Sequence, residues 1–114
     1  MDLKDIAQRL EHFARERDWE QFHSPKNLAM ALSVETSELL ELFQWLSEEQ
    51  SRRLSPEALK AVSEEAADIL LYLIRLSDKL DIDLVAAAKD KLSINAKKYP
   101  VHKARGTSKK YTDF

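Results

Sequence analysis

The sequence predicts an all-α protein, and three observations lead to this fold class. Apolar residues recur every three or four positions over most of the chain, which is the spacing of one face of an α-helix. The 114 residues include a single glycine, Gly106, although hairpins, bulges and phosphate-binding loops depend on this residue type. The pairs Ser24-Pro25 and Ser55-Pro56 match the N-cap and first position of two helices. We therefore expect an antiparallel fold resembling a four-helix bundle.

The first two helices are predicted in the N-terminal half of the chain. The first spans about residues 2–18, with Asp2 as its N-cap and Leu3, Ile6, Leu10 and Phe13 as its apolar stripe. The second begins at Ser24-Pro25 and extends to about Leu46. A polar connection, with room for one helical turn, then covers residues 47–54.

Two more helices are predicted over about residues 55–80 and 83–98, and Pro100 ends the last one because proline cannot continue a helix. Residues 101–114 are rich in Lys and Arg and show no helical period, so we predict a basic C-terminal tail there. The expected organisation is one all-α domain over residues 1–100, followed by this tail.

Composition excludes several classes of protein. With 44% hydrophobic and 33% charged residues, the chain is neither disordered nor membrane-spanning, and no apolar run approaches the roughly 18–20 residues that cross a bilayer. The net charge of −2 gives no reason to expect nucleic acid as a partner. The absence of Cys excludes disulfide scaffolds and thiolate chemistry. Together with a first segment that does not resemble a signal peptide, it favours a cytoplasmic location.

Two carboxylates interrupt the apolar stripe of the second helix. The stripe is about 80° wide at a helical period of 3.6 residues, and it comprises Leu28, Leu32, Leu39, Leu42 and Leu46. Glu35 projects into the middle of this stripe, and Glu38 lies about 60° away at its edge. A single glutamate on a helix is most often solvated. Burial of an unpaired carboxylate costs several kcal/mol, so a mid-stripe glutamate requires compensation.

The third helix repeats this arrangement. Glu65 lies inside a stripe and Asp68 lies on its flank, where the stripe comprises Ala58, Val62, Ile69, Tyr72 and Leu76. Two such helices packed antiparallel would bring four carboxylates together, which suits Mg²⁺ or Mn²⁺ better than zinc or copper. The three histidines, His12, His23 and His102, form no metal-spaced pair. Because Mg²⁺ commonly shares its coordination shell with phosphates, the pattern indicates phosphoryl chemistry.

Glu35-x-x-Glu38 followed by Glu65-x-x-Asp68 resembles the ExxE…ExxD signature of the all-α nucleoside triphosphate pyrophosphatases, the MazG-like superfamily. Three further segments resemble the dCTP pyrophosphatase branch, and they are residues 16–28 (ERDWEQFHSPKNL), 42–45 (LFQW) and 91–100 (KLSINAKKYP). Together with the acidic signature, these segments extend in order from residue 16 to residue 100, which is most of the chain. One departure is Ser37, where relatives often carry a smaller Gly or Ala.

The resemblance implies an oligomeric MazG fold that hydrolyses a nucleoside triphosphate, dCTP or a modified dCTP, to a monophosphate and pyrophosphate. It also implies that Glu35, Glu38, Glu65 and Asp68 are the catalytic residues and hold Mg²⁺, with Mn²⁺ as a substitute. One of these carboxylates is a candidate to orient the attacking water. Such an activity would remove unwanted nucleotides from the cellular pool.

The remaining candidate residues would bind the nucleotide. Trp19, Phe22 and Trp45 offer surfaces on which a base can stack, and His23 and Asn95 offer hydrogen bonds to its edge. Positive charge for the phosphates would come from Lys91 and Lys98, and contacts to ribose or phosphate from Tyr72 and Tyr99. Ordinary packing between helices is the alternative role for each of the aromatic residues.

Apolar residues on a second face of two helices, Leu40, Phe43, Leu70 and Ile74, lead us to expect burial against another subunit in a homodimer or homotetramer. Two alternatives stay open at this point. The chain could be a relative with the same fold, such as a phosphoribosyl-ATP pyrophosphatase or a dimeric dUTPase. It could also be a helical interaction module whose acidic face binds a basic partner.

Overall fold

The computed structural model describes residues 1–114 and is helical throughout, without a strand, which confirms the predicted fold class. Its helices are α1 (Leu3–Glu16), η1 (Glu20–Phe22), α2 (Pro25–Glu41), α3 (Glu48–Ser51), α4 (Pro56–Lys79), α5 (Leu84–Lys98), α6 (Val101–Ala104) and η2 (Tyr111–Asp113). The chain forms two compact units, Met1–Asp81 and Ile82–Phe114, which we describe separately. None of the helices has the length and apolar character that crossing a membrane requires.

The helices begin where the sequence places their caps. Ser24 Oγ accepts a hydrogen bond from the Asn27 N–H, and Ser55 Oγ accepts one from the Ala58 N–H, each at 3.1 Å. Proline follows each serine as the first helical residue. An N–H at this position would make no hydrogen bond within the helix, so proline, which has no N–H, is well tolerated there. Asp2 caps α1 in the same way. Short polar side chains therefore set the start of the long helices of the first unit.

The predicted end of the second helix is wrong by five residues, and that of the first helix differs by two. The second helix ends at Glu41, not at Leu46, because the next N–H groups bond three residues back, as from Phe43 to the Leu40 carbonyl at 2.9 Å. Such tighter bonds end an α-helix in turns. The first helix ends at Glu16, and Asp18 then adopts a left-handed conformation with φ of 53°. Short polar residues such as Asp tolerate this conformation, which reverses the chain before η1.

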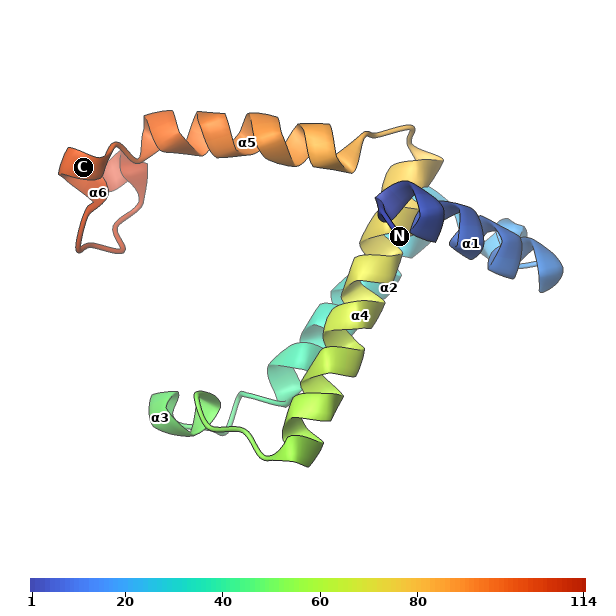
Figure 1. The fold of residues 1–114 in the computed structure, drawn as a ribbon, viewed down its shortest axis with the longest axis horizontal. Coiled ribbons are helices and arrows are strands. Elements are labelled where there is room, and N and C mark those ends of the chain that lie inside the picture. The colour runs from blue at the N-terminus through green and yellow to red at the C-terminus, as the bar shows by residue number, and fades with distance from the viewer. The chain divides into compact units, whose positions relative to one another are not determined.

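Helices α2 and α4 lie side by side and run antiparallel, and α1 packs against α4 (Figure 1). The apolar core of this unit is small, with Ala14, Leu28 and Ile74 buried from α1, α2 and α4, respectively. Our expectation that Ile74 belongs to an outward face is therefore wrong, since it is 3% exposed. Leu40 and Leu70, from the same predicted face, are 62% and 41% exposed.

The second unit contains α5 and the segment that follows it. Short helices α6 and η2 form within residues 101–114, the segment that we predicted to be a basic tail from its lack of a helical period. Tyr99 makes edge contacts with Tyr111 and Phe114, with ring centroids 5.9 and 5.8 Å apart. Lys98 Nζ lies 4.9 Å from the centre of the Tyr111 ring. Aromatic packing on the end of α5 thus orders the segment. The expected domain boundary at residue 100 stays a prediction.

Replacement of Ser55 by Ala tests the cap of α4. The Ser55→Ala variant loses the acceptor for the Ala58 N–H, so we expect its free energy of unfolding to fall by about 1 kcal/mol. Ser63→Ala, in the exposed middle of the same helix, is the matched control and should not destabilise the protein, because Ala favours helix. Urea unfolding measures both variants. Equal stability of Ser55→Ala and the unmodified protein would contradict the assigned cap.

Candidate metal centre and adjoining pocket

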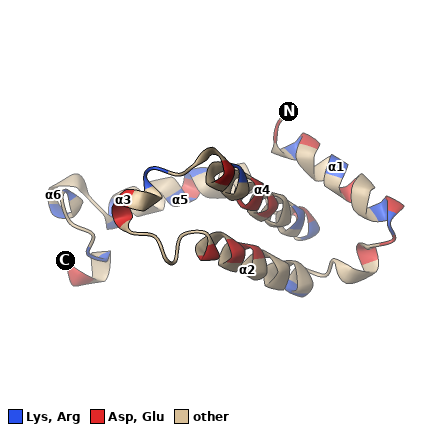
Figure 2. Ribbon diagram, turned by 90° about the horizontal axis from the view of Figure 1, so that it is seen from below, with Lys and Arg blue, Asp and Glu red and all other residues tan.

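Three of the four predicted ligands meet between α2 and α4. Glu35 and Glu38 are one helical turn apart on α2, and Glu65 faces them from α4. One carboxylate oxygen from each of these residues lies within 4.8 Å of the other two. Figure 2 shows Asp and Glu residues, coloured red, on both α2 and α4. We call Glu35, Glu38 and Glu65 the acidic cluster.

No positive side chain compensates this cluster. The Oε2 atoms of Glu35 and Glu65 are buried and have no hydrogen-bond partner. The ion pairs of the protein involve other residues. The pKa of Glu35 is raised to about 7, first because a proton can be shared with the Glu65 carboxyl, and further by burial and by the nearby Glu38. The cluster is therefore a set of negative charges that the protein alone does not balance.

This arrangement fits a metal ion. Carboxylate oxygens are the ligands that hard divalent cations prefer, and a cation would supply a partner for the orphaned oxygens of Glu35 and Glu65. A bound cation would favour the ionised carboxylate, and so would oppose the proton sharing with Glu65, the burial and the nearby Glu38 that raise the pKa of Glu35. The acidic cluster has the donor chemistry of a metal centre.

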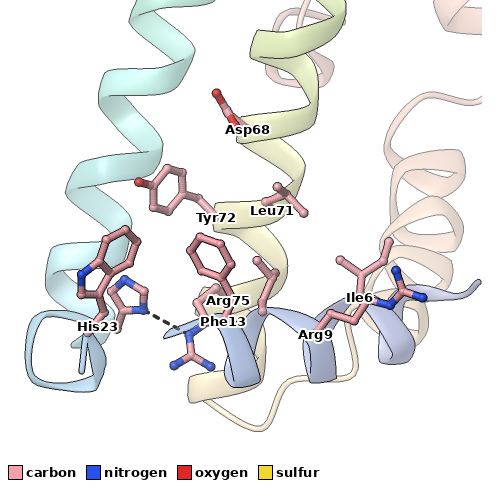
Figure 3. A pocket seen from close by; sticks show the side chains of 10 residues that line it. Ile6, Arg9, Phe13, His23, Asp68, Leu71, Tyr72 and Arg75 are labelled. Carbon is pink, nitrogen blue, oxygen red and sulfur yellow. Dashed lines mark hydrogen bonds between the residues drawn. The ribbon is translucent and has the colours of Figure 1, made fainter. Parts of the chain in front are cut away.

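Asp68, the fourth predicted ligand, is not part of the acidic cluster. It follows Glu65 by one turn of α4, and its side chain lines a pocket next to the cluster (Figure 3). Its role as a ligand stays a prediction. Its position links the acidic cluster to the pocket.

The pocket has a volume of about 380 Å³, which is within the range of small-molecule sites. Apolar residues of α1 form one side, while Trp19 and His23 precede α2, and Asp68, Tyr72 and Arg75 come from α4. The Trp19 ring packs edge-on against Phe13 and His23, with centroids 5.6 and 6.1 Å apart. Three predicted nucleotide-binding residues, Trp19, His23 and Tyr72, therefore lie in one pocket.

The other predicted binding residues lie outside this pocket. Phe22 and Trp45 are 58% and 87% exposed, and neither lines the pocket. Lys91, Asn95, Lys98 and Tyr99 belong to the second unit. The roles assigned to these six residues stay predictions.

Sequence reasoning missed Arg75 and the contribution of α1 to the pocket. Arg75 follows Asp68 by seven residues, which is two helical turns, so both side chains lie on the same face of α4. Its position within the apolar run from Leu70 to Leu76 is the signal that could have identified it, since an arginine is rarely buried without a partner. The pocket's α1 residues gave no signal beyond their apolar stripe.

The fold and the acidic cluster define an all-α protein with a candidate metal centre beside a small-molecule pocket. The model of the MazG-like family matches residues 30–114. This chain belongs to the MazG-like family, and the predicted family is confirmed.

The chain is similar to curated members of one branch of this family. It is 47% identical to dCTP pyrophosphatase 1 of Bos taurus in an alignment 113 residues long that covers 97% of this chain and 67% of the bovine protein. It is 45% identical to dCTP pyrophosphatase 1 of Homo sapiens, again over 97% of this chain and 66% of the human protein. The chain thus spans about two thirds of the length of these relatives.

A solved structure is also similar. A pyrophosphatase from Archaeoglobus fulgidus has a TM-score of 0.80 and is 39% identical, with 85% of this chain and 91% of that chain covered. The similarity extends over most of both chains, which confirms the predicted MazG-like fold.

Titration of the metal-free protein tests the acidic cluster. The pKa of Glu35 rises from an ordinary 4.5 to about 7 on folding, so the folded protein holds an extra proton between these values. The resulting stability is present below pH 4.5 and is lost as the pH rises through 7. We therefore expect the melting temperature to increase as the pH falls from about 7 to about 5. Glu35→Gln should weaken this increase and should melt higher than the unmodified protein at pH 7.

Glu64→Gln is the matched control, because Glu64 is exposed and neighbours the cluster residue Glu65 in sequence. It should keep the pH profile of the unmodified protein. Mg²⁺ should raise the melting temperature of the unmodified protein and of Glu64→Gln in a concentration-dependent way, but not that of Glu35→Gln. Identical pH profiles and identical Mg²⁺ responses in all three proteins would mean that Glu35 has only a structural role.

Proposed function

We propose that this protein is a Mg²⁺-dependent nucleoside triphosphate pyrophosphohydrolase that acts on dCTP or a modified dCTP. The single observation that carries the proposal is the pair of buried, unpartnered oxygens of Glu35 and Glu65, which lie in the ExxE…ExxD positions. The names of the relatives and of the structural neighbour support this class of enzyme, which the sequence also predicts. Removal of unwanted nucleotides from the cellular pool is the corresponding role.

The acidic cluster would hold the metal. Glu35, Glu38 and Glu65 are its nearest set of oxygens, and Asp68 would join them from the next turn of α4. Bound Mg²⁺ would supply positive charge for the triphosphate, which carries about four negative charges at neutral pH. Mn²⁺ prefers the same oxygen ligands and is the expected substitute.

In the proposed reaction, water would attack the α-phosphorus. The bond from this phosphorus to the oxygen that bridges the α- and β-phosphates would break, and this oxygen would leave with pyrophosphate. A carboxylate of the cluster would accept a hydrogen bond from this water and orient it. Because Asp68 lies both beside the cluster and in the pocket wall, the α-phosphate would be placed near this residue. Lys91 and Lys98 are the proposed source of positive charge for the departing pyrophosphate.

The pocket would bind the base. Trp19 offers a flat face for stacking, Tyr72 a hydroxyl and His23 a ring nitrogen, and α1 supplies an apolar wall. In this proposal Phe22, Trp45, Asn95 and Tyr99 complete the nucleotide site in the assembled protein. We expect the protein to be a homodimer or homotetramer and to be located in the cytoplasm. Large exposed apolar side chains, such as Leu40 and Trp45, support association of subunits.

Identification of the products tests the proposed bond cleavage. Protein incubated with dCTP and Mg²⁺ should yield dCMP and pyrophosphate, and EDTA should abolish the reaction. Glu38→Gln, which keeps the shape but removes the charge, should lower the rate by about 10²-fold if Glu38 binds the metal. Glu41→Gln, exposed at the end of the same helix, is the control and should keep the rate. Formation of dCDP and orthophosphate, or full activity in EDTA, would refute the proposal.

Comparison of substrates tests the base pocket. His23→Ala should reduce the discrimination among the four deoxynucleoside triphosphates by about tenfold, because a buried hydrogen bond to the preferred base is lost. Asn95→Ala tests the second predicted polar contact in the same way. His12→Ala is the control, since His12 is exposed and pairs with Glu16 at 2.9 Å. Relative rates that stay unchanged in the His23 and Asn95 variants would rule out this base site.

A further inference from the structure

The charged residue Arg75 lines the pocket, and it is only 3% exposed. Its Nη2 donates to Glu20 Oε1 at 2.5 Å, and its Nε donates to His23 Nδ1 at 3.3 Å. The hydrogen bond to His23 is drawn in Figure 3. Glu20 and His23 are more than 50 residues from Arg75 in sequence, so this one side chain fastens the segment around η1 to α4.

The charge of Arg75 is balanced by carboxylates. Glu20 binds both Arg75 and Lys79, and hydrogen bonds first from Lys79 and then from Arg75 lower the pKa of Glu20 to about 2. Asp78 lies 3.9 Å from the Arg75 guanidinium. The positive charges of Arg75 and Lys79 thus lie beside the negative charges of Glu20 and Asp78. The net charge of this group of side chains stays near zero when His23 is neutral. Burial, and then the charge of Arg75, lower the pKa of His23 below its ordinary value.

The contact with Arg75 determines which nitrogen of His23 carries the proton. A guanidinium group has only donors, so the Nδ1 atom that faces it must accept. In the neutral imidazole the proton then resides on Nε2, for which the structure shows no partner in the protein. Because His23 lines the pocket, Nε2–H is the group that it can offer to a ligand.

We propose that Arg75 is a positioning residue that holds His23 in its Nε2–H form, so that the pocket presents a hydrogen-bond donor to the edge of the base. This inference rests on the proposed function, since it names how the same pocket selects its nucleotide. A donor at this point matches a base that presents an acceptor. N3 of cytosine is an acceptor, whereas N3 of uracil or thymine carries a hydrogen. The proposal places Nε2–H against N3, where it favours cytosine over uracil; against O2, an acceptor in both bases, the same donor would not discriminate.

The first test reads the ring protons directly. Long-range ¹H–¹⁵N NMR spectra of the protein without metal or nucleotide should show His23 with a protonated Nε2 and an unprotonated Nδ1 at pH about 7.5. The exposed His12 and His102 serve as internal references. In Arg75→Met, which removes the donor but keeps an apolar stem, the pKa of His23 should rise. A protonated Nδ1 in the unmodified protein, or an unchanged His23 pKa in Arg75→Met, would overturn the proposal.

The second test measures selectivity. The ratio of kcat/KM for dCTP to that for dUTP should fall by about tenfold in Arg75→Met and by less in Arg75→Lys, which keeps the buried charge and a donor but not the planar fork. If His23 keeps its proton on Nε2 in Arg75→Lys but the selectivity falls as far as in Arg75→Met, the role assigned to Arg75 is refuted. If the unmodified protein hydrolyses no nucleotide, the proposed function is refuted. The NMR test still decides the role of Arg75 in that case, because it uses no nucleotide.

Discussion

The constraint on which this structure depends is the meeting of Glu35 and Glu65 between two packed helices. Each buries a carboxylate oxygen that no protein group satisfies. The folded chain accepts this cost, although its buried apolar core is small. A cation at this point would turn the least favourable contact of the α2–α4 pair into a stabilising one. Stability and function therefore oppose each other in the metal-free protein and agree in the metal-bound one.

A second set of charges surrounds Arg75, ten residues after Glu65 on α4, and it differs from the acidic cluster because positive and negative groups are paired. Arg75 and Lys79 are matched by Glu20, so these groups are satisfied without any ligand. Their role is to fix the segment that carries Trp19 and His23 against α4. The acidic cluster and this satisfied network lie on the same helix, with Asp68 near the junction. Helix α4 thereby aligns a proposed metal centre with a proposed base pocket.

The helices and the acidic cluster could be predicted because their signals are local. Ser24 and Ser55 cap helices through side chains that reach only three residues ahead, and Glu35 interrupts a stripe within its own helix. Arg75 could not be assigned a partner, because Glu20 lies 55 residues away and only the fold brings them together. The end of α2 at Glu41 depends on tightened turns that the leucine pattern does not encode.

The central claim is that the acidic cluster binds a divalent cation in the folded protein. Isothermal titration of the metal-free protein with Mn²⁺ measures this most directly, with a Glu35→Gln/Glu65→Gln double variant as the comparison. We predict saturable binding to the unmodified protein and no such binding to the double variant, while both keep the same helical content by circular dichroism. Equal Mn²⁺ affinity in the two proteins would contradict it.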